Sequence, residues 1–406
     1  MSSRRRPNAT SRRLAERALL AVGTAAAAAA AFQLLLVAAA VAGRRRVPSG
    51  AGDAPGLRFV VLIPAHDEEV TLPGTLAAVA ALDYPPELVR VVVVADNCED
   101  ATADIARAGG AEVLDRHATG RGKGAALSWA LPRLGEDGAE YDAVLFLDAD
   151  CAPSPNLLTA IDRRMRGGAR AVQCSYVVAN PTESWSAGLR YASFALMNTV
   201  RPQGRDALGL SSGILGSGFA IEREVLDRHG WRAFSLTEDT EYQLQLLDAG
   251  VRVRFAGEAE VSSPMPASLR DSREQHARWE SGKLLMLSGW ASRLLLAGMR
   301  KRDPAYLLAA LEGALPPQSV LAAWSFVTAL AGALLGSRPV LKLGLACAGA
   351  QGVYVLGGLR LAGAPATVYR ALACAPLLMA WKLRLYVQLL TGRAPRDWER
   401  TPRGDR

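Results

Sequence analysis

Apolar residues gather toward the two ends of the chain, and polar residues dominate between them. Near the N-terminus, Ala18–Gly43 carries no charged residue, and about 20 apolar residues are enough for a helix to cross a bilayer. We therefore predict a transmembrane helix over residues 18–43, after a basic tail over 1–17. A cleaved signal peptide is the alternative, but its apolar core would be shorter and would end at a small-residue cleavage site. Arg44–Arg46 close the segment directly, which favours the transmembrane helix.

A second apolar region extends over residues 305–390. It contains two long charge-free stretches, Gly313–Ser337 and Leu343–Leu359. Each stretch predicts a further membrane span, since each is long and apolar enough to place most of its residues in the hydrocarbon core.

Two other segments beside these spans have mixed character. Ala371–Leu390 contains Lys382 and Arg384, and charged side chains are costly at the bilayer centre. We expect this stretch to span only in part or to lie at the interface, with a basic tail over 391–406 after it. Residues 284–300 mix leucines and a tryptophan with polar side chains, which predicts an amphipathic helix on the membrane surface.

The polar segment over residues 57–283 alternates short apolar runs with helical patterns. The runs of strand length are Leu57–Ile63, Leu88–Ala95 and Ala143–Leu147, and the helical patterns are Thr71–Leu82, Thr102–Ala108, Ala125–Leu134 and Asn156–Met165. This alternation is typical of an α/β domain. Each strand-like run ends in acidic residues, and ligands of open parallel sheets bind at such strand ends.

The net charge of +8 arises mainly from basic residues that flank the predicted spans, where anionic lipid headgroups attract them. No basic patch alternates with aromatic residues, as a nucleic-acid-binding surface would require, so we expect no nucleic-acid partner. The five cysteines show no CxxC pair and no metal-ligand spacing. They are expected to be reduced thiols of a cytoplasmic domain and of the bilayer.

Two carboxylates follow the third strand-like run. In a strand, alternate side chains point to the same face, so Asp148 and Asp150 would share one side and hold one cation. Carboxylate oxygens suit Mg²⁺ or Mn²⁺, and a diphosphate would complete the coordination. The alternative for this pair is an ordinary solvated turn.

Asp96 ends the second run. Its carboxylate would either hydrogen-bond the base or ribose of a nucleotide or cap the helix that starts at Thr102. Lys123 lies in the glycine-rich loop Gly120–Gly124, which could approach a diphosphate closely. The residue after the lysine is Gly124, so the loop is not a Walker A motif, and a kinase or ATPase is disfavoured.

Two further groups could take part in group transfer. Thr237–Asp239 precede the predicted helix Thr240–Ala249, so a carboxylate there would either accept the proton of an attacking hydroxyl or complement the helix dipole. Gln275, Arg278 and Trp279 share one helix face. Arginine there could neutralise a leaving diphosphate and the indole could carry a sugar, although an interfacial tryptophan with a snorkelling arginine is the alternative.

Seven motifs, taken in this order, resemble the family 2 glycosyltransferases, and especially the membrane-bound branch of cellulose, hyaluronan and poly-N-acetylglucosamine synthases. They are VVLIPAHDEE, VVVVADNCED, GRGKGAAL, LFLDADC, GSGFAIER, SLTEDTEY and QHARWESGK. The resemblance implies an α/β GT-A fold with flanking transmembrane helices, an inverting mechanism, a UDP-sugar donor and a divalent metal, Mg²⁺ or Mn²⁺.

Matched residue by residue, the resemblance implies a donor site. Asp67 and Asp96 match positions that contact the nucleotide, and Lys123 lies in the loop beside it. Asp148 matches the first aspartate of the D-x-D motif, and Asp150 matches the second, which contacts the metal.

The same matching implies where the transfer takes place. Asp239 matches the catalytic base of the TED motif, and Glu238 is its neighbour in the pocket. Gln275, Arg278 and Trp279 match the QxxRW motif, which in the family borders the acceptor and the diphosphate.

The expected activity is transfer of a hexose or N-acetylhexosamine from a UDP-sugar to a glycan or lipid-linked acceptor, for exopolysaccharide or cell-envelope glycan synthesis. The catalytic domain would be cytoplasmic, in a multi-pass protein of the plasma membrane with export or polymerisation partners. The basic C-terminal tail favours a cytoplasmic C-terminus, and a cytoplasmic domain then requires two spans after it. One span before the domain would place the arginines of residues 1–17 outside, which the positive-inside rule opposes.

Two other functions fit the same pattern less well. A polyprenyl-phosphate sugar synthase has a phosphate acceptor that needs no strong base, and the TED and QxxRW motifs argue against it. A catalytically silent membrane scaffold would have no chemical reason to keep Asp148, Asp150 and Asp239 together.

Overall fold

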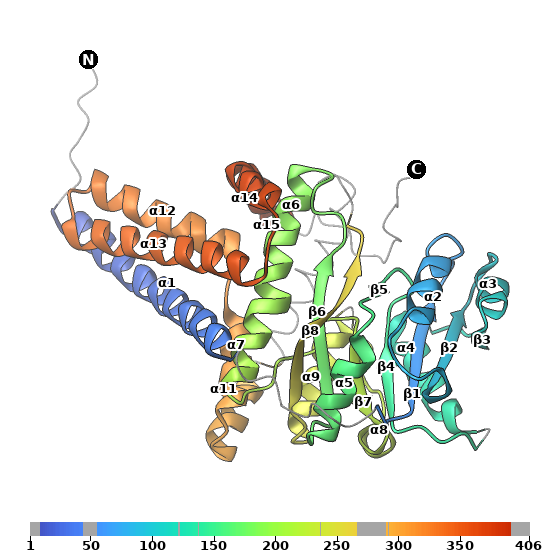
Figure 1. The fold of residues 1–406 in the computed structure, drawn as a ribbon. Coiled ribbons are helices and arrows are strands. Elements are labelled where there is room, and N and C mark those ends of the chain that lie inside the picture. Colours follow the sequence, from blue (N-terminus) through green and yellow to red (C-terminus); the bar gives the residue numbers. More distant parts are fainter. Residues whose placement is uncertain are drawn as a thin grey trace.

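The structure is a computed structural model that describes residues 9–43, 55–120, 122–136, 138–235, 237–265, 290 and 292–390. Figure 1 shows two parts, a twisted sheet with helices on both faces and a bundle of long helices that leans away from it.

A mixed sheet of eight strands forms the centre of the first part, in the order β3-β2-β1-β4-β7-β6-β8-β5. Its strands are β1 (Phe59–Ala65), β2 (Val89–Asp96), β3 (Glu112–Arg116), β4 (Ala143–Phe146), β5 (Ala152–Pro153), β6 (Ala171–Val178), β7 (Phe219–Glu222) and β8 (Val253–Ser263). The strands β3, β2, β1 and β4 are parallel, and β7 pairs antiparallel with both β4 and β6. The three strands predicted from the sequence are β1, β2 and β4, and these predictions are confirmed.

The helices of this part are α2 (Leu72–Ala80), α3 (Thr102–Ala108), α4 (Lys123–Ala130), α5 (Leu157–Arg166), α6 (Trp185–Phe194), α7 (Arg201–Ala207), α8 (Arg223–His229) and α9 (Glu238–Asp248). Strand β1 is apolar throughout because it is covered on both faces. Phe59 and Val61 pack with α2 and α5, whereas Val60 and Leu62 pack with α4 and α9. The helices predicted before and after these strands are confirmed, with ends that differ by a few residues.

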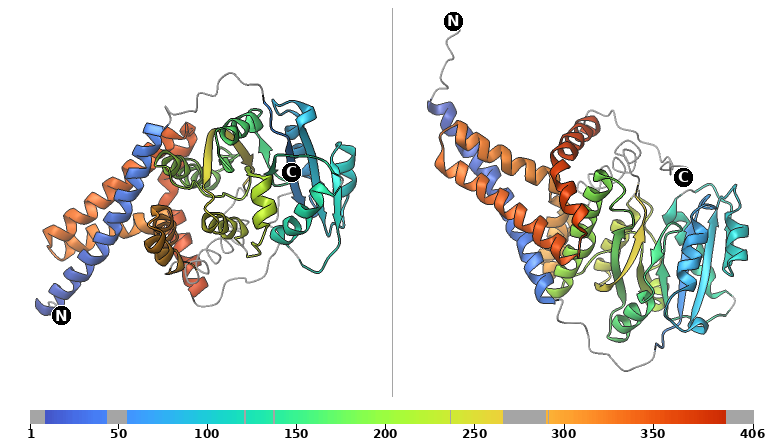
Figure 2. Two further views of the ribbon diagram at one scale, coloured as in Figure 1. Left: turned by 90° about the horizontal axis from the view of Figure 1, so that it is seen from below. Right: turned by 45° about the horizontal axis from the view of Figure 1, so that its top comes forward.

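The second part consists of α1 (Ala9–Gly43), α11 (Pro304–Ala314), α12 (Gln318–Leu334), α13 (Arg338–Leu361), α14 (Ala366–Ala371) and α15 (Ala375–Leu390). In Figure 2, α1, α12 and α13 lie side by side as a bundle. Two described helical stretches, Arg12–Gly43 and Arg338–Leu361, are long and apolar enough to cross a membrane. They coincide with two of the stretches predicted as spans.

The charge-free stretch Gly313–Ser337, predicted as a span, is broken near its start. Pro316 and Pro317 interrupt it, because proline lacks the amide hydrogen that a helix interior needs. Helices α11 and α12 meet there at a bend of 71°, and they make a third candidate span only if the bent pair counts as one.

Helices α12 and α13 approach closely through small residues, as membrane helices commonly do. A Cβ atom on Gly332 would lie 2.3 Å from the amide nitrogen of Leu341, and one on Gly344 would lie 2.3 Å from that of Ala329. Larger side chains at these two glycines would therefore force the helices apart.

A long helical segment joins the two parts. It comprises α6, a π-helical turn over Ala195–Val200, and α7, and in Figure 1 it stands between the sheet and the bundle. Gly204 of α7 packs against α1, where a Cβ atom would lie 2.3 Å from the carbonyl oxygen of Leu36. The bundle is thus attached directly to the α/β part.

The amphipathic helix predicted over residues 284–300 lies partly outside the described residues, which resume at 290. Residues 292–301 are helical, and Leu294 packs in one apolar cluster with Leu244 and Leu247 of α9 and Tyr306 of α11. One face of the described part of this helix therefore packs against protein, whereas Leu295, Leu296 and Met299 are exposed.

Candidate active site

A cavity of about 1,780 Å³ opens at the carboxyl ends of the parallel strands. Because β1, β2 and β4 run in the same direction, their last residues meet at one edge of the sheet. The cavity is lined there by His66 after β1, Asp96 at the end of β2, and Asp148 and Asp150 after β4. The carboxylates predicted from the ends of separate strands thus reach one site.

Lys123 connects the glycine-rich loop to the first of the paired aspartates. Its Nζ atom donates to Asp148 Oδ1 at 2.5 Å and to the carbonyl oxygen of Gly216 at 2.5 Å. Gly122 precedes it with a φ of +100°, a conformation open to glycine, and this turn begins α4 with Lys123. Burial lowers the pKa of Lys123, but Asp148 and Glu238 raise it by more, so the ammonium stays charged.

Asp148, Asp150 and Cys151 place their potential ligand atoms within 4.8 Å of one another. Burial and the two neighbouring carboxylates raise the pKa of the Cys151 thiol well above its ordinary value, so it remains protonated and is a poor ligand. Asp150 also accepts a hydrogen bond from Ser263 Oγ at 3.3 Å. The hard oxygens of Asp148 and Asp150 therefore fit a divalent cation such as Mg²⁺ or Mn²⁺.

Two acidic residues begin α9 and face the same cavity. Burial raises the pKa of Glu238 to about 7, with Asp239 adding to the shift and Lys123 opposing it. Burial also raises the pKa of Asp239, although the hydrogen bond from the Thr240 amide at 2.7 Å lowers it. A Cβ atom on Gly216 would lie 3.7 Å from Asp239 Oδ2, so this carboxylate lies beside the loop that also binds Lys123.

Asp96 is held by a partner that sequence reasoning missed. The guanidinium of Arg116, at the end of β3, donates to the Asp96 carboxylate, and both side chains are buried. Arg116 also donates to the carbonyl oxygen of Gly120 at 2.8 Å, which ties the glycine-rich loop to β2. The register of β2 and β3 pairs Asp96 directly with Arg116, and this cross-strand pairing cannot be read from the spacing of the two residues.

The carboxylate that contacts the start of α3 is that of Asp100, not Asp96, and the N-cap residue is Ala101. The Thr102 amide donates to Asp100 Oδ1 at 2.9 Å. Asp96 lines the cavity, and it forms a buried charged pair with Arg116 at the strand ends.

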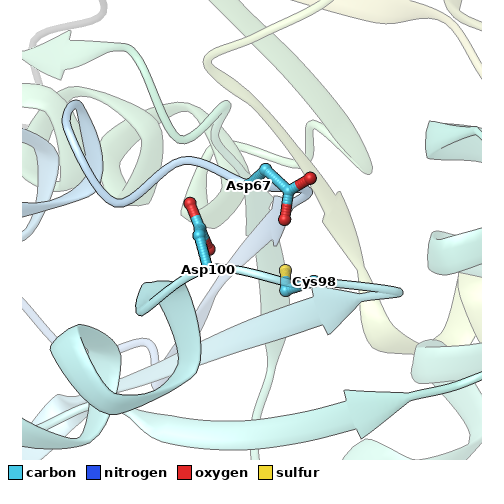
Figure 3. Close-up of side chains that lie close together, drawn as sticks. All are labelled: Asp67, Cys98 and Asp100. Carbon is cyan, nitrogen blue, oxygen red and sulfur yellow. The ribbon is translucent and has the colours of Figure 1, made fainter.

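Asp67 lies in the loop after β1 and organises the neighbouring loop. Figure 3 shows its carboxylate beside Cys98 and Asp100, and its Oδ1 accepts a hydrogen bond from the Glu99 amide at 2.8 Å. Asp67 has a φ of +52°, a strained conformation for a residue with a side chain. The contact fixes the loop after β2 relative to β1.

The remaining predicted site residues, Gln275, Arg278 and Trp279, lie outside the described residues. The structure brings the other predicted residues around one cavity, either in its lining or, for Asp67, in the adjoining loop. The lining residues among them are Asp96, Lys123, Asp148, Asp150, Glu238 and Asp239.

The same cavity continues away from the sheet into the helical bundle. Its lining there includes Arg201 and Arg205 of α7, Glu312 of α11, Gln318 at the start of α12 and Gln351 of α13. These residues are separated widely in the sequence, and apolar side chains of α12, α13 and α15 surround them. The cavity thus has a charged half at the strand ends and a half bounded by candidate membrane helices.

The chain is similar to several known proteins. It is 27% identical over 238 residues to the "Probable glycosyltransferase YdaM" of Bacillus subtilis (strain 168), a match that covers 55% of this chain and 54% of that protein. It is 33% identical over 201 residues to a "Beta-monoglucosyldiacylglycerol synthase" of Nostoc sp., covering 47% of this chain and 41% of that protein. The matched region thus spans about half the length of these curated relatives, or less.

Among solved structures, the mannosyltransferase PcManGT from Pyrobaculum calidifontis, in complex with GDP-Man and Mn²⁺, superposes with a TM-score of 0.50 at 20% identity. The match covers 84% of this chain and 98% of that one, and it shows a shared GT-A fold. A family model described as "Glycosyltransferase like family 2" matches residues 55–282, more than half of the chain. The chain therefore belongs to the family 2 glycosyltransferases and is a glycosyltransferase.

Proposed function

We propose that the protein is an inverting glycosyltransferase that moves a hexose or N-acetylhexosamine from a UDP-sugar to a lipid-linked or glycan acceptor at the membrane. The catalytic domain, residues 57–283, would be cytoplasmic, and the protein would cross the plasma membrane more than once. Within the family we place it in the membrane-bound branch that includes the cellulose and hyaluronan synthases. Its product would serve exopolysaccharide or cell-envelope glycan synthesis, with export or polymerisation partners.

The continuity of the cavity carries this proposal. One hollow joins the carboxylates Asp148, Asp150 and Asp239 to Gln318 and Gln351 of two helices in the apolar bundle. An acceptor anchored in the bilayer could reach the reacting centre through the bundle half while the nucleotide occupies the strand ends. The name of the Nostoc relative is consistent with a lipid acceptor.

The donor would bind at the strand ends. Asp96, fixed by its buried pair with Arg116, would hydrogen-bond the nucleoside, and Asp67 would hold the loop after β2 in place. Lys123 would contact the diphosphate, and Asp148 and Asp150 would hold the divalent cation. A cation there would offset the negative charge of the departing diphosphate.

The transfer step follows from this arrangement. The acceptor hydroxyl oxygen attacks the anomeric carbon, the bond from that carbon to the diphosphate oxygen breaks, and UDP leaves with the bonding electrons. The hydroxyl proton passes to the Asp239 carboxylate. Attack opposite to the leaving group inverts the anomeric configuration.

Asp239 is our choice of base over Glu238. Asp239 has one oxygen fixed by the Thr240 amide and the other beside Gly216, so its free oxygen has a defined position. Glu238 would raise the proton affinity of its neighbour by repulsion. Gln275, Arg278 and Trp279 would border the acceptor and the diphosphate.

The experiment is incorporation of label from a panel of UDP-sugars into membranes that contain the protein, with Mn²⁺ or Mg²⁺. We expect Asp239→Asn to lose about 10² to 10⁴ of the rate, the usual contribution of a general base. Asp248→Asn is the matched control, because Asp248 ends the same helix with half of its side chain exposed. Equal turnover by wild type and Asp239→Asn would refute the base assignment, and failure to consume any UDP-sugar would refute the donor class.

A further inference from the structure

Two arginines on α7 lie in the bundle half of the cavity. Arg205 is 8% exposed and forms an ion pair with Glu312 of α11. Arg201, one helical turn before it, donates from Nε to the phenol oxygen of Tyr354 on α13 at 2.8 Å. Arg201, Arg205 and Glu312 line the cavity.

The charges of this group do not balance. Two guanidiniums meet one carboxylate, since the partner of Arg201 is a neutral phenol. Among the described residues, Glu312 is the one acidic side chain that interacts with either guanidinium. Burial and the repulsion of Arg201 lower the pKa of Arg205. The attraction of Glu312 raises this pKa but offsets the lowering only in part. Burial of two cations beside one carboxylate is costly, so an added anion would stabilise the site.

The uncompensated charge lies at one end of the candidate membrane spans. Ala207 of α7 touches Gly43, the last residue of α1, where a Cβ atom would lie 2.6 Å from that of Ala207. Tyr354 is two turns before Leu361, the last residue of α13. Lipid phosphates lie at this end of the spans, just outside the hydrocarbon core, and arginine side chains about two turns inside the end can extend toward them.

We propose that Arg201 and Arg205 bind the phosphoryl group of an anionic membrane lipid. This inference rests on the proposed function, because it takes the bound lipid to be the acceptor. It names the chemical class of that lipid-linked acceptor. Guanidinium presents a planar set of donors that matches phosphate oxygens, and the Arg205 Nε is buried without a partner among the described residues. Val355 and Leu356 of α13 line the same cavity and would contact the apolar chain of the lipid.

A structural reading of the same contacts is that Arg205 and Glu312 merely join α7 to α11. The two readings predict opposite effects of one substitution. Glu312→Gln breaks the ion pair, so it would weaken a structural contact, but it frees a guanidinium and so favours an anionic ligand.

The test measures lipid binding without any donor sugar, so its failure is distinguishable from failure of the transferase activity. Full-length protein in detergent micelles is offered equimolar phosphatidylglycerol and diacylglycerol with identical acyl chains, and native mass spectrometry counts the lipid retained. We expect wild type to prefer the phosphatidylglycerol. Arg201→Gln should reduce that preference about tenfold, the size of one hydrogen bond to a charged group.

Tyr354→Phe is the matched control, because it removes the neutral partner of Arg201 and leaves the charge, and it should retain the lipid. Glu312→Gln should bind phosphatidylglycerol at least as well as wild type. Should Arg201→Gln fail to fold, Glu312→Gln alone decides, since loss of the preference in that folded variant contradicts the proposal.

Three other outcomes would overturn the inference. Equal retention of the two lipids by wild type would show that the protein does not recognise the phosphoryl group. Displacement of the lipid by excess inorganic phosphate would assign the site to the free anion. Weaker binding of UDP with Mn²⁺ by a folded Arg201→Gln protein would assign the arginine to the donor diphosphate instead.

Discussion

The two halves of the cavity are built in different ways. At the strand ends, each functional side chain belongs to a short motif that follows a strand or begins a helix, as with Asp96, Asp148 and Glu238. In the bundle half, Arg205, Glu312 and Gln351 come from three helices without a shared motif. The first half is therefore specified locally, and the second exists only once the helices pack. Four substitutions separate the contributions of the two halves.

The largest effect is expected at the metal-binding end. Asp150→Asn keeps the size of the side chain but removes the charge that would hold a divalent cation, and a catalytic metal contributes several kcal/mol. We expect turnover to fall about 10³-fold, and chelation of the wild type should cause a similar loss. Asp83→Asn, on the loop after α2, is the control. If turnover survives both chelation and Asp150→Asn, the proposed metal site is wrong.

A smaller but still large effect is expected for the buried pair at the strand ends. Arg116→Met leaves the Asp96 carboxylate buried without its partner, and removal of one member of a buried pair costs about 3 to 5 kcal/mol. Denaturant unfolding should show this loss, and KM for the UDP-sugar should rise because Asp96 is no longer fixed. Arg90→Met, which breaks the more exposed pair with Glu112, should cost under about 1 kcal/mol. Equal losses in the two variants would contradict the structure of this pair.

The acidic pair of α9 predicts the pH dependence of the reaction. A base acts only when ionised, so turnover should fall as pH drops through the raised pKa of Asp239, at a higher pH than an ordinary aspartate would give. Below that point the rate would fall tenfold per pH unit. Glu238→Gln removes the charge that repels the Asp239 carboxylate, so the decline should move to lower pH. A profile that does not move in Glu238→Gln would show that the two groups do not titrate together.

The sequence predicts the strand-end half of the cavity better than the bundle half, because local motifs build the first and helix packing builds the second. The strands β1, β2 and β4 and the acidic residues at their ends are local features, and apolar runs with terminal carboxylates were sufficient to find them. Arg116 was missed because its pairing with Asp96 depends on the register of β3 against β2. The bend at Pro316 and Pro317 was missed because a charge count over Gly313–Ser337 takes no account of proline.

The bundle half was not predictable from local patterns at all. A glutamine within a charge-free stretch gives no sign of the residue it will face, since its partner lies on another helix. Gln33 of α1 donates to Gln318 Oε1 at 2.9 Å, and Gln318 donates to Gln351. Three amides far apart in the sequence thus meet beside the cavity, which Gln318 and Gln351 line.

The smallest effect is expected from breaking this amide chain. Gln33→Leu removes one interhelical hydrogen bond, and such bonds between membrane helices average about 0.6 kcal/mol. The midpoint of thermal unfolding in detergent should therefore fall only slightly, with Gly344→Leu as the contrasting variant, because a side chain there has no space between α12 and α13. UDP binding at the strand ends should be unchanged in Gln33→Leu. A large loss of UDP binding would mean that the two halves are coupled more tightly than their separate construction implies, and the amides would then have to be counted with the donor site.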